Sequence, residues 1–211
     1  MMKNNLFIIN KGGYKYIGYA LLATFIFIIL DLELFSFITF GLGLFFIYVF
    51  RNPERESFFL DEKAVVSPID GVVKAIDELK NKEYSYKVTI EASYLNVGVL
   101  RVPLNGKIED IKVSRGARTS KHSKLFHDLN ETAELIFIDG YNNKIKVVHR
   151  LKQSFAPLNI EVSKNDVLQK NSRYGYGVNM ISELYLPKNF RFDIRLNSEI
   201  RASQSLIGYF T

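Results

Sequence analysis

Histidine and cysteine, two residue types that often act as bases and nucleophiles in enzymes, are rare or absent in this chain. Its 211 residues include three histidines (His122, His127 and His149) and no cysteine. A cysteine nucleophile, a thiolate metal site and a disulfide are therefore excluded, and three histidines leave little material for a metal site, so we expect none. Asp70 lies in the segment Ser67–Gly71 (Ser-Pro-Ile-Asp-Gly), which is typical of a turn in which an aspartate bonds to nearby backbone amides.

The histidines are weak candidates on their own. His122 and His127 are five residues apart in a polar segment, so they would not share a helix face, and we expect them at the surface. His149 follows the apolar pair Val147-Val148 and could act as a base, but the neighbouring Arg150 disfavours that role.

A second kind of chemistry is suggested by basic residues. The net charge is +6, of which residues 1–50 carry +1, so the rest of the chain carries +5. This modest excess suits a surface beside anionic lipid headgroups. Without a long basic run or a basic-aromatic array, binding to nucleic acid is not expected. The candidate lipid-binding residues are Arg101, Arg115, Arg118, Lys121 and Lys124, although an arginine in a strand, such as Arg101, is more often a solvated or paired surface residue.

Two apolar runs near the N-terminus must position these groups. Ile17–Leu30 and Leu34–Phe50 contain no charged residue, and only Asp31-Leu32-Glu33 separates them. A membrane-spanning helix needs about 20 apolar residues, and interfacial tyrosines with Lys15 and Arg51 can extend both runs. We expect a transmembrane hairpin (residues 1–50) with spans at about 15–31 and 34–50. A buried hairpin in a soluble core and a shallow re-entrant hairpin are the alternatives.

The charges that flank the runs predict an orientation. Lys3, Lys11 and Lys15 precede the first run and Arg51 follows the second, whereas the connection between the runs holds only acids. The excess of positive charge on one side predicts that both termini and the main domain are cytoplasmic, in a multi-pass protein of the cytoplasmic membrane. The second run has no small-residue cleavage site, so we interpret the hairpin as permanent rather than as a signal peptide.

Residues 51–211 alternate in the manner of strands. Short β-branched segments lie at close spacing between Gly, Pro and Asn residues, and Gly140–Asn143 separates two of them as a hairpin turn. Only Thr119–Asn130 is predicted to be helical or irregular. The fold class is therefore mainly β, a β-rich sandwich or barrel domain preceded by the two-helix transmembrane hairpin. The predicted strands are 65–66, 72–73, 87–90, 97–102, 107–113, 134–139, 144–148, 159–162, 183–186 and 190–196.

Five segments, in this order, resemble the phosphatidylserine decarboxylase family, in particular its short, membrane-anchored type. Phe50–Arg55 is similar to the family's Phe-Arg-Asp-Pro-Glu-Arg, and Ser67–Val73 to its Ser-Pro-Ala-Asp-Gly segment. Asn96–Gly106 follows its Asp-Val-His-x-x-Arg-x-Pro-x-x-Gly segment. Asn130-Glu131 falls where the family has Asn-Glu-Arg, and Leu184–Pro187 ends the segment that carries the cleavage site.

The resemblance implies a proenzyme that cuts its own backbone at a Gly-Ser bond. The serine then becomes an N-terminal pyruvoyl group, which forms a Schiff base with the substrate amine and accepts electrons during loss of carbon dioxide. Such a cut needs a serine hydroxyl next to the broken bond and a base, which an Asp–His pair provides in the family. Asp70 stands at the position of that aspartate.

The other processing residues are missing. Gly98 occupies the histidine position, and the Gly-Ser position falls at Asn179-Met180. Ser182 is the nearest hydroxyl, but it follows Ile181 and comes two positions late. We therefore expect no cofactor, with a pyruvoyl group only if processing is non-standard.

Three hypotheses follow. The first is a membrane-anchored family member linked to phospholipid metabolism that no longer processes itself, a pseudoenzyme. It would bind anionic lipid or aminophospholipid, or a protein of phospholipid synthesis. The second is an active phosphatidylserine decarboxylase, producing phosphatidylethanolamine, with non-standard processing. The third is a non-enzymatic membrane protein that binds another protein.

Overall fold

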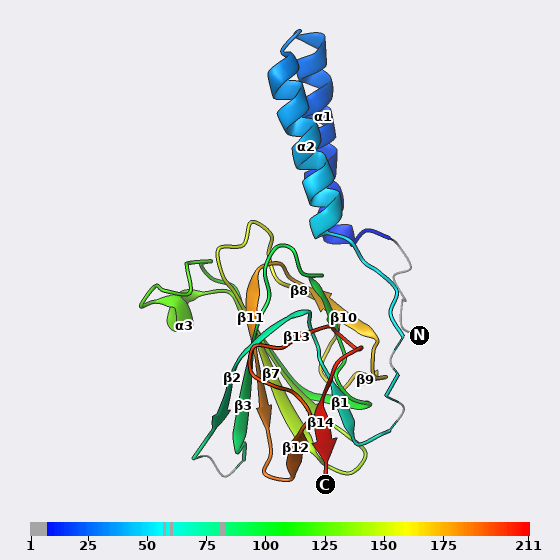
Figure 1. The fold of residues 1–211 in the computed structure, drawn as a ribbon, viewed down its shortest axis with the longest axis vertical. Helices are drawn as coiled ribbons and strands as arrows, with labels where there is room; N and C mark the ends of the chain where they lie inside the picture. The colour runs from blue at the N-terminus through cyan, green and yellow to red at the C-terminus, as the bar shows by residue number, and fades with distance from the viewer. Residues whose placement is uncertain (1–7, 57, 60, 81–82) are drawn as a thin grey trace.

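The computed structural model describes residues 8–56, 58–59, 61–80 and 83–211. A pair of antiparallel helices projects from one end of a β-rich domain (Figure 1). A short 3-10 helix, η1 (Lys11–Gly13), leads into α1 (Tyr14–Ile29), and α2 (Glu33–Val49) returns to the domain. The turn between the two helices contains Asp31 with a φ of 53°, a left-handed conformation that aspartate tolerates better than most residues.

The two helices pack closely through small and polar residues. A Cβ atom on Gly43 would lie 3.6 Å from the Cβ of Ala20, so the backbones approach one another here. The hydroxyl of Thr24 donates a hydrogen bond of 2.9 Å to Thr39 on the other helix. Both features are typical of helix pairs in an apolar solvent, where small residues and interhelical hydrogen bonds replace the hydrophobic effect.

The outer faces of the pair are apolar. Tyr19, Leu34 and Phe37 are each about 70 % exposed or more. The helical stretch Lys11–Ile29, with 19 residues, is long and apolar enough to cross a membrane, whereas Glu33–Val49 is a shorter apolar helix of 17 residues. A surface of this kind is unfavourable in water and is suited to lipid.

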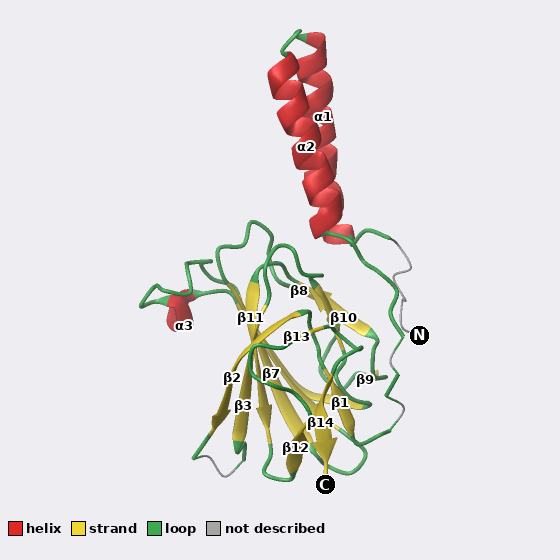
Figure 2. Cartoon of the chain, viewed as in Figure 1, coloured by secondary structure: helices red, strands yellow, loops and turns green. Residues whose placement is uncertain are grey.

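The described residues of the domain form three antiparallel sheets (Figure 2). The large sheet contains, in spatial order, β13 (Glu199–Ile200), β2 (Gly71–Glu78), β3 (Tyr86–Glu91), β11 (Met180–Leu186), β7 (Lys144–Leu151), β6 (Thr132–Ile138), β5 (Gly106–Ser114) and β9 (Val167–Leu168). The two smaller sheets are β4 (Val99–Arg101), β10 (Arg173–Tyr176) and β8 (Asn159–Ile160), and β1 (Ala64–Val66), β14 (Leu206–Phe210) and β12 (Phe190–Phe192).

The core lies between these sheets. In β6, Ala133, Leu135 and Phe137 are buried while the residues between them are half-buried, because successive side chains of a strand point to opposite faces. Leu100 of β4 and Tyr174 of β10 belong to the same buried cluster as these residues. The smaller sheets therefore cover one face of the large sheet, and the predicted β-rich fold with a preceding helical pair is confirmed.

A separate aromatic cluster joins the hairpin to the domain. Phe50 is fully buried, and its ring stacks on Tyr16 of α1 and on Tyr176 of β10, with centroids 5.3 Å apart in each pair. The hydroxyl of Tyr176 donates to the carbonyl oxygen of Val49 at 2.9 Å, and that of Tyr16 donates to Phe155 at 3.2 Å. These contacts hold the base of the two helices against β10 and against the loop that contains Phe155.

The segment predicted to be helical or irregular, Thr119–Asn130, contains one short helix, α3 (Phe126–Leu129), and loop on its N-terminal side. This segment protrudes from the side of the domain (Figure 1).

Candidate active site

Asn179-Met180, which the resemblance leads us to expect at the processing position, lies at the start of β11. Asn179 has a φ of 54°, a left-handed conformation in which glycine is most comfortable and asparagine is tolerated. Its side-chain amide donates to the carbonyl oxygen of Lys152 at 2.6 Å. Met180 is buried, and its carbonyl oxygen accepts from the amide of Ala92 at 2.9 Å. The turn that a Gly-Ser pair would need is thus present, but a buried thioether stands in place of the hydroxyl.

No side chain fits at Gly98, where the resemblance leads us to expect the family histidine. A Cβ atom there would lie 2.4 Å from the carbonyl oxygen of Gly177 and 2.9 and 3.0 Å from ring atoms of Tyr176. The Tyr176 ring is buried and held by Phe50 and by its bond to Val49. Tyr176 therefore fills the space that a histidine at position 98 would enter.

Asp70 lies next to this region but is engaged elsewhere. Its carboxylate pairs with both terminal nitrogens of Arg55, one at 2.8 Å, and accepts from the amides of Ala202 at 2.8 Å and Val97 at 3.4 Å. The expected bonds to amides of its own turn are replaced by contacts with three distant segments. Paired guanidinium–carboxylate bonds are strong and directional, so Asp70 ties the segment that leaves the hairpin to the domain.

Asp70 also lines a cleft at the base of the hairpin. The cleft has a volume of about 530 Å³, and its lining includes Arg51, Leu95 and Asn96, together with Glu199 of β13 and Arg201, which follows β13. Polar residues of both charges thus face one space beside the aromatic cluster that holds the helices.

Three buried polar side chains, His149, Ser182 and Tyr174, form a hydrogen-bonded group that was not predicted from the sequence. His149 of β7 lies opposite Ser182 of β11, and its Nδ1 is 2.6 Å from the Ser182 hydroxyl. Its Nε2 is 2.5 Å from the hydroxyl of Tyr174. A neutral imidazole has one donor and one acceptor nitrogen, so the two hydroxyls satisfy both.

The environment of His149 keeps it neutral. The side chains of His149, Ser182 and Tyr174 are all fully buried, and burial lowers the pKa of His149 to about 3. A neutral histidine in contact with a serine is the pair that activates a hydroxyl in nucleophilic catalysis. However, Ser182 lies inside β11 with β3 and β7 paired on its two sides, so the backbone before it is fixed.

The comparisons with known proteins agree with the order of these segments. Residues 42–208 match the family model for phosphatidylserine decarboxylase. The chain belongs to the phosphatidylserine decarboxylase family. It is 30 % identical over 218 residues to the phosphatidylserine decarboxylase proenzyme of Geobacter metallireducens, covering 98 % of this chain and 99 % of the relative.

Two further relatives carry the same name. The chain is 26 % identical over 207 residues to the proenzyme of Desulfotalea psychrophila, with 94 % of each chain covered. It is 27 % identical over 216 residues to that of Syntrophus aciditrophicus, covering 99 % of this chain and 100 % of the relative. Membership of the phosphatidylserine decarboxylase family supports a place in phospholipid metabolism.

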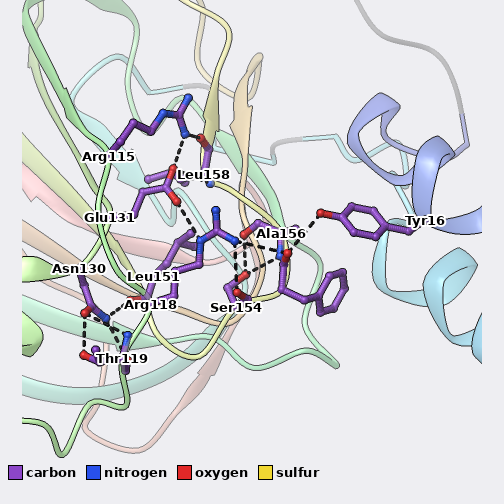
Figure 3. A network of polar contacts seen from close by, with 11 residues as sticks. Tyr16, Arg115, Arg118, Thr119, Asn130, Glu131, Leu151, Ser154, Ala156 and Leu158 are labelled. Atoms are coloured by element: carbon purple, nitrogen blue, oxygen red, sulfur yellow. Dashed lines mark hydrogen bonds and ion pairs between the residues drawn. The ribbon is translucent and has the colours of Figure 1, made fainter.

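The basic residues proposed from the sequence have varied surroundings. Arg115 and Arg118 both pair with Glu131, which is almost fully buried and also accepts from the amide of Leu158 at 3.3 Å (Figure 3). Arg118 further donates to Phe155, whose carbonyl oxygen also accepts from Tyr16 of the hairpin. This pair of arginines therefore organises the loop beneath the helices.

The lysines of the same segment differ from one another. Lys121 Nζ is 2.8 Å from Glu91, which also pairs with Lys152. Burial of Glu91 favours its neutral form, but the hydrogen bonds from Lys121 and Lys152 outweigh it and lower the pKa of Glu91 to about 2. Lys124 is exposed, as are His122 and His127.

Arg101 is buried rather than at the surface. Its guanidinium donates to Pro53 O at 2.7 Å and to Asn171 O and Oδ1 at 3.1 and 2.9 Å. Burial, followed by the charges of Arg173 and Arg55, lowers the pKa of Arg101 to about 10. Across the described part of the chain, His, Asp and Glu residues form no cluster that could hold a metal ion.

Proposed function

We propose that this chain is a membrane-anchored member of the family that acts in phospholipid metabolism as an uncut protein. The observation that carries the proposal is the packing of Tyr176 against Gly98, which leaves no room for a histidine side chain. Met180 stands at the serine position and has no hydroxyl for an acyl shift. A chain that keeps the fold but lacks these two groups would hold no pyruvoyl group and release no carbon dioxide.

A second candidate function is a decarboxylase processed at Ser182. The contact of 2.6 Å between Ser182 and a neutral His149 favours it. In that case the Ser182 oxygen would form an ester with the Ile181 carbonyl as the peptide C–N bond breaks, with His149 carrying the proton between them. Two features oppose it: the β-branched Ile181 is stiff, and both neighbouring strands hold this backbone in place.

The proposed topology is a two-span hairpin with both termini and the domain of residues 51–211 on the cytoplasmic side of the cytoplasmic membrane. Lys11, Lys15 and Arg51 support it, because they lie at the domain end of the helices while Asp31 and Glu33 lie at the far end. Lys3, which belongs to the same basic flank, lies outside the described residues. The boundary at residue 50 remains a prediction, since Phe50 packs with both parts.

The proposed ligands are anionic lipid or aminophospholipid of the same leaflet. Lys124, which is exposed, carries this proposal on the protruding segment, whereas Lys121 pairs with Glu91 and the two arginines share the buried carboxylate of Glu131. A protein of phospholipid synthesis is a further candidate partner.

Activity is tested with the full chain in nanodiscs that contain phosphatidylserine. We expect no carbon dioxide above the protein-free level and no labelling by a carbonyl-reactive hydrazide. The proenzyme of Geobacter metallireducens, prepared in the same way, is the positive control. Turnover or hydrazide labelling that disappears in Ser182→Ala would replace the first candidate by the second. A second experiment measures how much delipidated protein is retained by nanodiscs with and without phosphatidylserine. Greater retention with phosphatidylserine favours lipid binding, and equal retention favours a purely protein-binding role.

A further inference from the structure

Two cations on one side of the domain, the buried Arg101 and the half-buried Lys170, form no ion pair with a carboxylate among the described residues. Arg101 donates only to Pro53 O and to the carbonyl and side-chain oxygens of Asn171. Lys170 donates to the carbonyl oxygens of Phe59 at 3.1 Å and Asp61 at 2.6 Å. All of these hydrogen-bond acceptors are neutral, so neither cation has a carboxylate in direct contact.

Two of the acidic groups nearby are already paired. Asp70 binds Arg55, and Glu54 binds Arg173 at 2.6 Å. Burial lowers the pKa of Lys170, although Asp61 and Glu62 partly offset the effect, and burial is also the main cause of the lowered pKa of Arg101. Buried charges are costly unless an opposite charge accompanies them, so an anion in contact with the buried Arg101 and the half-buried Lys170 would be stabilised.

Both cations line the same pocket. The pocket has a volume of about 250 Å³ and is formed by Arg101 of β4 and by the turn that leads from β9 into β10, with Glu54 at its rim. The lining residues between the two strands are Gln169, Lys170, Asn171 and Ser172, and Arg173, the first residue of β10, completes the lining. This volume lies below the roughly 300–1,000 Å³ of sites for drug-sized ligands, which favours a small anion over a whole lipid molecule.

The local backbone shapes this pocket. Asn171 has a φ of 74°, a left-handed conformation that aims its side chain back at the segment leaving the hairpin. Its Nδ2 donates to Arg55 O at 2.6 Å while its Oδ1 accepts from Arg101. The amide of Lys170 donates to Asn105 Oδ1 at 2.8 Å. The cations are thus fixed before any ligand arrives, which reduces the entropy cost of binding.

We propose that this pocket binds a phosphate group through Arg101 and Lys170. A guanidinium fork and an ammonium group together suit the tetrahedral oxygens of a phosphate, and the guanidinium of Arg173, which pairs with Glu54, lies at the same opening. The phosphate could be free in solution or part of a phospholipid headgroup, since both present the same oxyanion. This site is independent of whether the chain is cut, because Met180 and Ser182 lie outside its lining.

The test uses the full chain in detergent micelles and follows thermal unfolding by circular dichroism. Inorganic phosphate at a hundredfold excess over its dissociation constant should raise Tm by roughly 5–10 °C, whereas chloride at equal ionic strength should not. Equilibrium dialysis with radiolabelled phosphate gives the dissociation constant directly. Lys170→Gln should weaken binding at least tenfold. Lys164→Gln is the matched control, because Lys164 is exposed and pairs with Asp110 elsewhere.

Three ligands separate the possible sources. Binding of inorganic phosphate and glycerophosphoethanolamine, lost in Lys170→Gln, identifies a site for soluble phosphates. Binding confined to phosphatidic acid in nanodiscs, and lost in the same variant, identifies a headgroup site. Absence of binding by all three ligands, or equal binding by wild type and Lys170→Gln, overturns the proposal. Dialysis of the wild-type chain reports on binding by itself, and circular dichroism of Lys170→Gln without ligand shows that the variant keeps the fold.

Discussion

The buried His149 should make the stability of this protein sensitive to mild acid. Its folded-state pKa of about 3 lies below the ordinary value of 6.5 because of burial. Below pH 6.5 the unfolded chain therefore binds a proton at His149, whereas the folded chain does not. The contribution of His149 to the free energy of unfolding is fully present above pH 6.5 and is lost as the pH falls toward the folded-state pKa.

The size of the effect follows from these two pKa values. Between pH 7 and pH 5, one such histidine lowers the free energy of unfolding by about 2 kcal/mol. The window stops at pH 5 because Glu91, with a pKa of about 2 against 4.5, adds its own loss of stability at lower pH. Urea unfolding of the full chain in detergent, followed by circular dichroism at several pH values, measures this loss.

Two variants isolate the cause. His149→Gln should be less stable at pH 7, because the hydroxyls of Ser182 and Tyr174 lose their partner, but its stability should lose the part of the pH dependence due to this histidine. Ser182→Ala keeps the buried imidazole and should retain the loss. An equal fall in stability in wild type and in His149→Gln would refute the assignment to His149.

Three further predictions concern packing and topology. Glu131→Gln should lower the free energy of unfolding in urea by about 2–3 kcal/mol, because the buried acceptor of two arginines loses its charge. The control, Glu134→Gln, removes the charge of a more exposed pair with Lys146 and should lower it by about 0–1 kcal/mol. Equal losses in the two variants would contradict this prediction. Gly98→Ala should lower stability by about 1–3 kcal/mol through overpacking, whereas Gly140→Ala, which has open space around it, should be nearly neutral; a well-tolerated Gly98→Ala would mean that Tyr176 does not fill the position. In this cysteine-free chain, a cysteine at Asp31 should react with an impermeant thiol reagent on intact cells and one at Lys188 should not, and the reverse labelling would invert the proposed topology.

Much of the fold could be predicted because it depends on local patterns. The predicted spans of 15–31 and 34–50 are within two residues of α1 and α2, since two long uncharged runs separated by acids permit few other structures. The β6–β7 hairpin was predicted from its turn, in which Asn142 takes a φ of 65°. The missed strands β9 and β13 have two residues each. In β10 and β14, glycines hide the pattern because they are poor strand formers.

The candidate site was only partly predictable. The absence of a histidine at position 98 and of a serine at position 180 is visible in the sequence. That Tyr176 occupies the space beside Gly98 depends on how β10 packs against the hairpin, and local spacing carries no trace of it. The contact between His149 and Ser182 depends on the register of two strands that are distant in sequence. Likewise, Arg115 and Arg118 were assigned to lipid because their buried partner, Glu131, is recognisable only once the chain is folded.

The intact mass of the protein purified from its own host tests the central claim most directly. We predict a single species near 24.3 kDa, because neither Met180 nor the fixed backbone at Ser182 supports an acyl shift. Two chains, the smaller one comprising residues 182–211 and beginning with a pyruvoyl group, would contradict the account and establish this protein as a processed enzyme.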